Sequence, residues 1–181
     1  GKYTEAISAL TAMIKGAPNR FDQQLYLGNA YFFSGDLEHA EQAYKQGLRL
    51  NSSSREARAN LASVYSAGGK YKEAILLYET LLQEPGDHPD IHYNLSLAFR
   101  YTGDLEKAEK QCQAAIDLKP EDAEYLTCMG EIAELKGMPD EARRLYLRAV
   151  RVNSKNGWPR VNLAKLHLSR GNLSDAEIEA K

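Results

Sequence analysis

Apolar residues recur along this chain at the spacing of a helix and not at that of a strand. Leu27, Ala30 and Tyr31 stand at positions i, i+3 and i+4. A second stripe of the same kind follows at Ala40, Ala43, Tyr44 and Leu48. Such stripes are typical of amphipathic helices. Gly35 stands where the first helix must end, and Asp36 behind it suits the N-cap of the second. The segment is predicted to form two helices joined by a short turn.

The same pattern returns every 34 residues. One position of the repeat is always glycine, at Gly1, Gly35, Gly69, Gly103, Gly137 and Gly171, and another is always alanine, at Ala6, Ala40, Ala74, Ala108, Ala142 and Ala176. Since glycine makes up about 7% of an average chain, five further glycines on one period have a chance of roughly one in a million. We predict one array of units with bounds 1–20, 21–54, 55–88, 89–122, 123–156 and 157–181, the first and last partial, and 1–20 only a second helix.

Within a unit, two further features support the helix pairs. Small residues recur on the first helix, at Gly28, Ala62, Ser96, Gly130 and Ala164, and are predicted to let the two helices approach closely. In the fifth unit Met138 takes the place of the capping residue and is a poor cap. Pro139 after it suits the first helical position, so the turn is expected to form in another way.

Composition and charge exclude several classes of function. The 181 residues carry a formal net charge of −2, which is typical neither of a basic nucleic-acid-binding protein nor of a strongly acidic tail. The apolar runs are far shorter than the 18 or so residues of a membrane span, so no membrane insertion is expected. The chain lacks an initiator Met and opens at the Gly of a repeat, which we interpret as a fragment of a longer protein. The compartment stays open, because a fragment without its N-terminus carries no information on whether the longer protein has a signal peptide.

No pattern of catalytic, cofactor-binding or metal-ligating residues stands out. His88 and His92 are i and i+4 apart with Asp87 and Asp90 nearby, and we interpret them as a polar turn and not as a metal site. Cys112 and Cys128 have no metal-like or redox-like spacing. The glycines fall at turns of the repeat and form no phosphate-binding loop, and no nucleophile elbow is present. We therefore expect no enzyme activity, cofactor or metal.

The residues Leu27, Gly28, Tyr31, Gly35, Ala40 and Tyr44 resemble the tetratricopeptide repeat, a helix–turn–helix unit of 34 residues. The resemblance covers the whole chain without an insertion. The chain departs from the pattern where the early aromatic is replaced, at Gln24, Arg58, His92 and Arg160, and where the usual tyrosine is Ala133 or His167. The resemblance implies an all-α, right-handed superhelical solenoid of antiparallel helix pairs. It also implies a protein-binding scaffold whose first helices line a concave groove for an extended peptide or a partner helix.

Groove-facing positions carried over from the resemblance give the candidate peptide-binding residues. An asparagine amide offers a donor and an acceptor to a peptide backbone, and aromatic side chains offer apolar anchors. The candidates are Tyr26, Asn29, Phe33, Asn60, Tyr93, Asn94, Tyr101 and Asn162. Two alternatives stay open, since the asparagines also suit a generic solvated face. Acidic residues also recur with the period, at Asp22, Glu56, Asp90 and Glu124. They would attract a basic ligand, or they only stabilise the N-terminal end of each helix dipole.

Other functions and partners are also left open. The array suits equally the substrate-recruiting arm of a larger enzyme, such as a glycosyltransferase, or a component of secretion or cell-envelope assembly. Trp158, the only tryptophan, marks a changed surface, an end cap or packing between units. The first helix lacks its partner, so end-to-end self-association is predicted through Ile7, Leu10, Met13 and Ile14.

Overall fold

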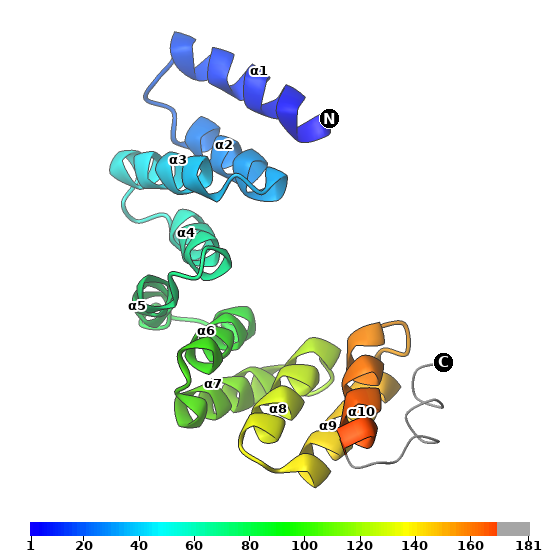
Figure 1. Cartoon of the computed structure of the whole chain (residues 1–181). Coiled ribbons are helices and arrows are strands. Elements are labelled where there is room, and N and C mark those ends of the chain that lie inside the picture. The colour runs from blue at the N-terminus through cyan, green and yellow to red at the C-terminus, as the bar shows by residue number, and fades with distance from the viewer. Residues whose placement is uncertain (170–181) are drawn as a thin grey trace. The chain divides into compact units, whose positions relative to one another are not determined.

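The computed structural model describes residues 1–169, which form ten α-helices and no strand (Figure 1). The helices are α1 (Lys2–Gly16), α2 (Phe21–Ser34), α3 (Leu37–Leu50), α4 (Arg55–Ala67), α5 (Tyr71–Leu81), α6 (Pro89–Thr102), α7 (Leu105–Leu118), α8 (Ala123–Leu135), α9 (Pro139–Val152) and α10 (Gly157–Ser169). The predicted all-α array of helix pairs is confirmed. The end of the last predicted unit, with Gly171 and Ala176, lies outside the described residues.

Two compact units divide the chain. The N-terminal unit, Gly1–Pro85, holds α1 to α5, and the C-terminal unit starts at Gly86 and holds α6 to α10. In the N-terminal unit α2 packs on α3, and α4 packs on α5 (Figure 1). α1 also packs on α2, and α3 packs on α4. The core of this unit is built around Leu25, Tyr44 and Leu61, all of them nearly inaccessible to solvent.

The C-terminal unit repeats this packing. α6 packs on α7 and α8 on α9, while α8 also contacts α7, and α10 lies against α9. Its most deeply buried side chains include Leu95, Leu126, Ile132, Tyr146 and Leu163. None of the helices in residues 1–169 is both long and apolar enough to span a membrane.

In the α2–α3 and α6–α7 pairs a glycine ends the first helix and an Asp caps the second, as predicted. Gly35 has φ of 86°, in the left-handed region that an L residue rarely adopts, and it ends α2. Asp36 caps α3, where its carboxylate accepts a hydrogen bond from the His39 backbone N–H at 3.2 Å. Before α9, Met138 makes no side-chain cap and Pro139 occupies the first turn, as predicted.

Close contact inside a pair depends on the small residue of its first helix. A Cβ added to Gly28 of α2 would lie only 2.5 Å from Tyr44 Cε1 of α3. Gly130 of α8 stands against Tyr146 of α9 in the same way. The prediction that small residues let the two helices approach is confirmed at both positions.

Candidate functional site

A groove of about 670 Å³ lies in the C-terminal unit, between the first helices α6 and α8 and the segment that leads into α10. α6 contributes Tyr93, Leu97, Arg100 and Tyr101, α8 contributes Glu124, Thr127, Cys128 and Glu131, and the segment contributes Asn153, Lys155, Asn156 and Trp158. Spacings of three and four residues place each helical set on one face of its helix. This volume lies within the range of protein sites that enclose small ligands or short segments.

Two large aromatic side chains on the groove remain open to solvent. Tyr101 is 60% exposed and Trp158 is 69% exposed, although both have large apolar areas. The guanidinium of Arg100 lies 5.0 Å from the centroid of the Tyr101 ring, which is cation–π distance. Exposed aromatic side chains in a hollow are the residues that most often dominate the energy of protein interfaces.

Local hydrogen bonds hold Trp158 on the groove. The side-chain oxygen of Asn156 accepts a hydrogen bond from the Trp158 backbone N–H at 3.1 Å, and the Pro159 ring after it is fully buried. The backbone on both sides of the tryptophan is therefore restrained. The sequence left the role of Trp158 open, and the structure places it on the wall of this groove.

Glu131 joins three helices at the floor of the groove. Its carboxylate accepts a hydrogen bond from the Arg100 guanidinium of α6 and another, at 3.2 Å, from the Asn162 amide of α10. Arg100 is only 17% exposed at its side chain, so this ion pair is mostly shielded from water. The pair fixes the guanidinium beside Tyr101 and leaves the groove without a strong net charge.

A tyrosine pair closes the groove near the start of α6. The rings of Tyr93 and Tyr125 lie with centroids 5.0 Å apart, and the Tyr125 hydroxyl donates a hydrogen bond to Asp90. This hydrogen bond lowers the pKa of Asp90, while burial raises the pKa of Tyr93. Tyr93 therefore stays a neutral hydroxyl at physiological pH, able to donate to a ligand.

Four of the predicted binding residues belong to the C-terminal unit. Tyr93 and Tyr101 line the groove, and their contact with a peptide stays a prediction. Asn162 is only 7% exposed, with one amide hydrogen bonded to Glu131. Asn94 is half-buried on α6 and is not among the residues that line the groove.

The other four predicted residues belong to the N-terminal unit. Tyr26 and Phe33 are largely exposed on α2, and the Phe33 ring stacks on Tyr3 with centroids 6.1 Å apart. The Asn60 amide of α4 donates to the side-chain oxygen of Asn29 at 3.1 Å. The Tyr44 hydroxyl donates to the same oxygen at 2.6 Å. These amides thus join consecutive repeats, and their contact with a ligand stays a prediction.

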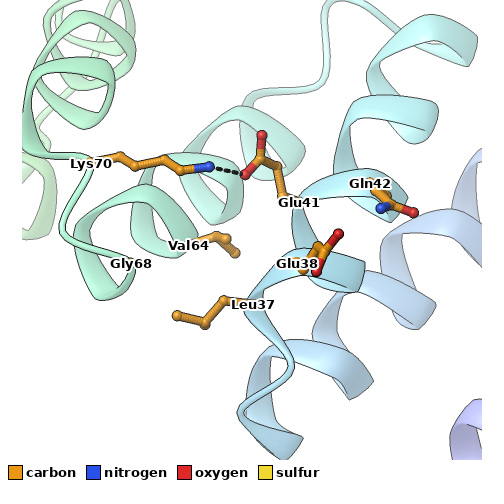
Figure 2. A pocket seen from close by; sticks show the side chains of 7 residues that line it. All are labelled: Leu37, Glu38, Glu41, Gln42, Val64, Gly68 and Lys70. Carbon is orange, nitrogen blue, oxygen red and sulfur yellow. Dashed lines mark hydrogen bonds and ion pairs between the residues drawn. The ribbon is translucent and has the colours of Figure 1, made fainter.

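A second hollow, of about 480 Å³, lies in the N-terminal unit and is drawn in Figure 2. Lys70 reaches across it to Glu41 at 2.7 Å, and Lys45 bonds the other oxygen of the same carboxylate at 2.6 Å. Leu37 and Val64 are the apolar side chains on its wall. With Glu41 and Lys70 already paired and no aromatic side chain on its wall, this hollow is a weaker candidate for protein binding than the groove.

The histidines and cysteines singled out in the sequence lie within the described residues. His92 Nδ1 lies 2.7 Å from Gln111 Oε1, a contact between two helices. Across residues 1–169, no group of three or more His, Cys, Asp or Glu side chains is arranged to hold a metal ion. Cys112 and Cys128 are free and buried. A hydrogen bond to Cys128, together with burial, raises the pKa of the Cys112 thiol.

Several groove residues were missed from the sequence. Leu97 and Arg100 follow Tyr93 at i+4 and i+7, so the helical spacing alone places them on the face of that tyrosine. Glu131 lies 31 residues after Arg100, as Asn60 lies 31 residues after Asn29, and both pairs are hydrogen-bonded. This second spacing, three residues short of the repeat, is a signal for contacts between neighbouring units.

Comparisons with known proteins agree with this fold. A family model described as tetratricopeptide repeat matches residues 1–55, 25–89, 59–123 and 93–157. Protein O-mannosyl-transferase TMTC1 of Homo sapiens is 27% identical over 154 residues, which cover 83% of this chain and 18% of that protein. The chain spans less than a third of the length of the first curated relatives that it matches.

Two solved structures are similar to this chain over most of its length. The crystal structure of MamA has a TM-score of 0.76 at 26% identity and covers 84% of this chain and 90% of its own. The crystal structure of YrrB, described as a TPR protein with an unusual peptide-binding site, has a TM-score of 0.68 at 23% identity. It covers 94% of this chain and 88% of its own.

Proposed function

Because the chain belongs to the tetratricopeptide-repeat family of protein-interaction scaffolds, we propose that its C-terminal unit binds an extended segment of a partner protein in the groove between α6, α8 and α10. The observation that carries this proposal is the pair of exposed aromatic side chains, Tyr101 and Trp158, on one groove. Both are rigid and apolar with a polar tip, so they bind a partner at low cost in conformational entropy.

The polar groups of the groove suit a peptide backbone more than a charged side chain. Arg100 and Glu131 neutralise each other, and Glu124 and Lys155 add one charge of each sign. Asn153 and Asn156 add amide groups next to Trp158, and such groups pair with backbone N–H and C=O whatever the side chains of the peptide. We expect a partner segment with apolar side chains for the aromatic walls and no strong net charge.

The test compares partners recovered from the native extract by the chain and by its Trp158→Ala and Tyr101→Ala variants. Truncating an aromatic anchor costs about 2 kcal/mol or more, or roughly 30-fold in affinity, so the partner should be lost. Tyr26→Ala is the comparison variant, because Tyr26 is 58% exposed and is a predicted binding residue of the N-terminal unit. Circular dichroism should show unchanged helix content in all three variants. A partner lost only with Tyr26→Ala would move the site to the N-terminal unit and refute this assignment.

Substitutions of the predicted asparagines are less suitable for this test than those of the aromatic residues. An Asn162→Ala substitution would leave Glu131 without one of its donors inside the scaffold. Its effect would mix binding with stability. The Tyr101 and Trp158 side chains are 60% and 69% exposed, so truncating them removes little buried packing.

A second proposal is that the array is the substrate-recruiting arm of a larger enzyme, and the match to a protein O-mannosyl-transferase favours it. The segment held in the groove would then belong to a protein substrate. In that case Trp158→Ala in the full-length enzyme should raise KM for the protein substrate and leave kcat unchanged. A fall in kcat at an unchanged KM would contradict a recruiting role. A role in secretion or cell-envelope assembly remains a third proposal, with the same groove as its binding site.

Self-association through α1 is also proposed. This helix contains no buried residue, and Met13 is 54% exposed while Ile7 and Leu10 are half-buried. Copies joined through this face would form oligomers that grow with concentration. Light scattering over a concentration series should show a rising mass, which Met13→Lys should suppress, and a constant monomer mass would contradict the proposal.

A further inference from the structure

A second, smaller pocket lies in the C-terminal unit between α7, α8 and α9, with a volume of about 170 Å³. It shares no residue with the groove described above. Its floor comes from α8, through Leu126, Met129 and Ala133, whereas the groove uses the face of Glu124, Cys128 and Glu131. At 100° per residue these two sets lie on opposite faces of α8, so both sites can be occupied at once.

The walls of this pocket combine apolar side chains with the polar and charged ones of Glu109, Gln113, Glu141, Arg144 and Arg148. Ile116 of α7 and Leu145 of α9 stand on its two sides, and Met138 stands at the turn before α9. Met138 is 47% exposed, and methionine is an unusual residue type at a helix N-cap. The sequence had marked this methionine as a poor cap and Ala133 as a departure from the usual tyrosine. Both departures meet at the same pocket.

The N-terminal unit contains the corresponding surface and serves as a comparison. Three repeats earlier, Gln24, Leu27 and Tyr31 of α2 occupy the positions of Leu126, Met129 and Ala133, and they line a hollow against α1 and α3. There the Tyr31 ring stacks on His39 with centroids 5.0 Å apart, and Gln24 adds an amide. The floor is therefore polar and aromatic in the N-terminal unit, and fully aliphatic in the C-terminal one.

Arginines border the pocket on the α9 side. From residue 143 to residue 152 this helix carries four arginines and no acidic residue, at Arg143, Arg144, Arg148 and Arg151. Arg144, Arg148 and Arg151 follow one another at i, i+4 and i+7 and so lie on one face. The two acidic residues on the rim are already paired, Glu141 with Arg144 and Glu109 with Lys136. Arg148 and Arg151 stand outside these two ion pairs, and the Arg148 guanidinium donates a hydrogen bond to the Pro120 carbonyl at 2.7 Å.

We propose that this pocket binds one apolar side chain of a partner protein, from a segment whose neighbouring residues are acidic. A cavity of about 150 Å³ lined by aliphatic side chains holds a benzene ring, so about 170 Å³ suits one leucine, methionine or phenylalanine side chain. Acidic residues on either side of this anchor then meet Arg148 and Arg151, and this charge complementarity selects the partner. The site is independent of the proposed peptide groove and gives the chain a second place to bind a protein.

The experiment selects peptides from a random phage-displayed library on the chain and removes those that also bind an Ala133→Tyr variant. The substitution restores the aromatic residue that earlier repeats have at this position, Tyr31, Tyr65 and Phe99, and fills the pocket. The expected consensus is one Leu, Met or Phe with Asp or Glu within about one helical turn of it. No enrichment of such a consensus would overturn the proposal.

The best selected peptide, labelled with fluorescein, is then titrated with variants by fluorescence anisotropy. Ala133→Tyr should weaken binding about tenfold or more, as expected for losing the burial of one large apolar side chain. Arg148→Glu combined with Arg151→Glu should weaken it several-fold, and high salt should reduce that difference. Trp158→Ala, on the opposite face, should leave the affinity unchanged. Equal affinity for wild type and Ala133→Tyr, or loss of binding with Trp158→Ala, would overturn the assignment.

The Met138→Asp variant tests whether a loss of binding is caused by unfolding. Asp is the residue at the equivalent position of the two Gly-Asp-Leu turns, at Asp36 and Asp104, where it caps the following helix. The substitution should therefore raise Tm through the new cap. The substitution should still weaken binding of the peptide, because it replaces an apolar side chain of the pocket by an anionic one that repels the acidic residues of the peptide. A stabilised Met138→Asp variant that binds the peptide with full affinity would exclude Met138 from the site and refute the proposed pocket.

Discussion

Replacing a helical glycine by alanine should have opposite effects at two positions of the same helix pair. Gly28 lies inside α2 and Gly47 inside α3, and both are buried. A Cβ at Gly28 would lie 2.5 to 2.8 Å from three atoms of the Tyr44 ring. A Cβ at Gly47 would meet nothing closer than 3.6 Å, the side chain of Gln24. We expect Gly28→Ala to destabilise the N-terminal unit and Gly47→Ala to stabilise it.

The magnitude follows from what each methyl group displaces. Carbon atoms pack at about 3.5 to 4.0 Å, so the Tyr44 ring must retreat by about 1 Å from a Gly28→Ala methyl. The ring is only 1% exposed, and its hydroxyl is bonded to Asn29, so little free space is available. Overpacking costs about 1–3 kcal/mol and loss of the hydrogen bond about 1 kcal/mol, against a gain of up to about 1 kcal/mol in helix propensity. The net loss is about 1–3 kcal/mol, whereas Gly47→Ala should gain about 0.5–1 kcal/mol.

Urea denaturation followed by far-UV circular dichroism measures both changes. Hydrogen exchange read by mass spectrometry assigns them to α2 and α3, since a local loss of stability speeds exchange in those peptides first. Peptides from α8 and α9, in the other unit, are the internal control. If Gly28→Ala is as stable as wild type, the close approach of α2 and α3 at this glycine is wrong. If Gly47→Ala is destabilised, the space beside α3 is smaller than the structure shows.

Two further predictions concern titration and thiol chemistry. The Tyr125 hydroxyl lowers the pKa of Asp90, so the stability this carboxylate adds is complete above its ordinary value of 3.8 and is lost as the pH falls through the lower folded pKa. Tm measured against pH should therefore fall less steeply in this acid range for Asp90→Asn, and an unchanged slope would contradict the hydrogen bond. Cys112 and Cys128 are 0% and 2% exposed, so iodoacetamide should label them about 100-fold more slowly in the native chain than in guanidinium. Rapid labelling of Cys128 alone would mean that the groove opens to its floor.

Helix positions were predictable from the sequence because their causes are local. A stripe at helical spacing, a glycine with positive φ and an Asp cap act within a few residues, and all three recur with the period. The end of α5 was not predictable in this way. This helix ends at Leu81, four residues before Pro85, which cannot continue a helix. Beyond its end Glu84 forms an ion pair with Arg58 of α4 at 2.5 Å. That contact is tertiary, and no local pattern encodes it.

The candidate site was only partly predictable, because a periodic polar residue has two possible partners. Asn60 recurs at the repeat spacing as Asn162, which suits a ligand lying along the repeats. It suits equally well a hydrogen bond to the preceding repeat, which is what Asn60 forms with Asn29 and Asn162 with Glu131. Periodicity cannot separate these cases, since the scaffold and a regular ligand have the same period.

Residues that break the period are more informative about binding. A repeat scaffold needs the same residue at each equivalent position, so a lone departure is not required by stacking of the units. Trp158 is such a departure and lies on the groove, while Ala133 and Met138 are departures that meet at the small pocket. In this chain the periodic residues build the helix pairs, and the aperiodic ones distinguish one surface from the next. Partner selection should therefore follow substitutions at aperiodic positions, and stability should follow those at periodic positions such as Gly28.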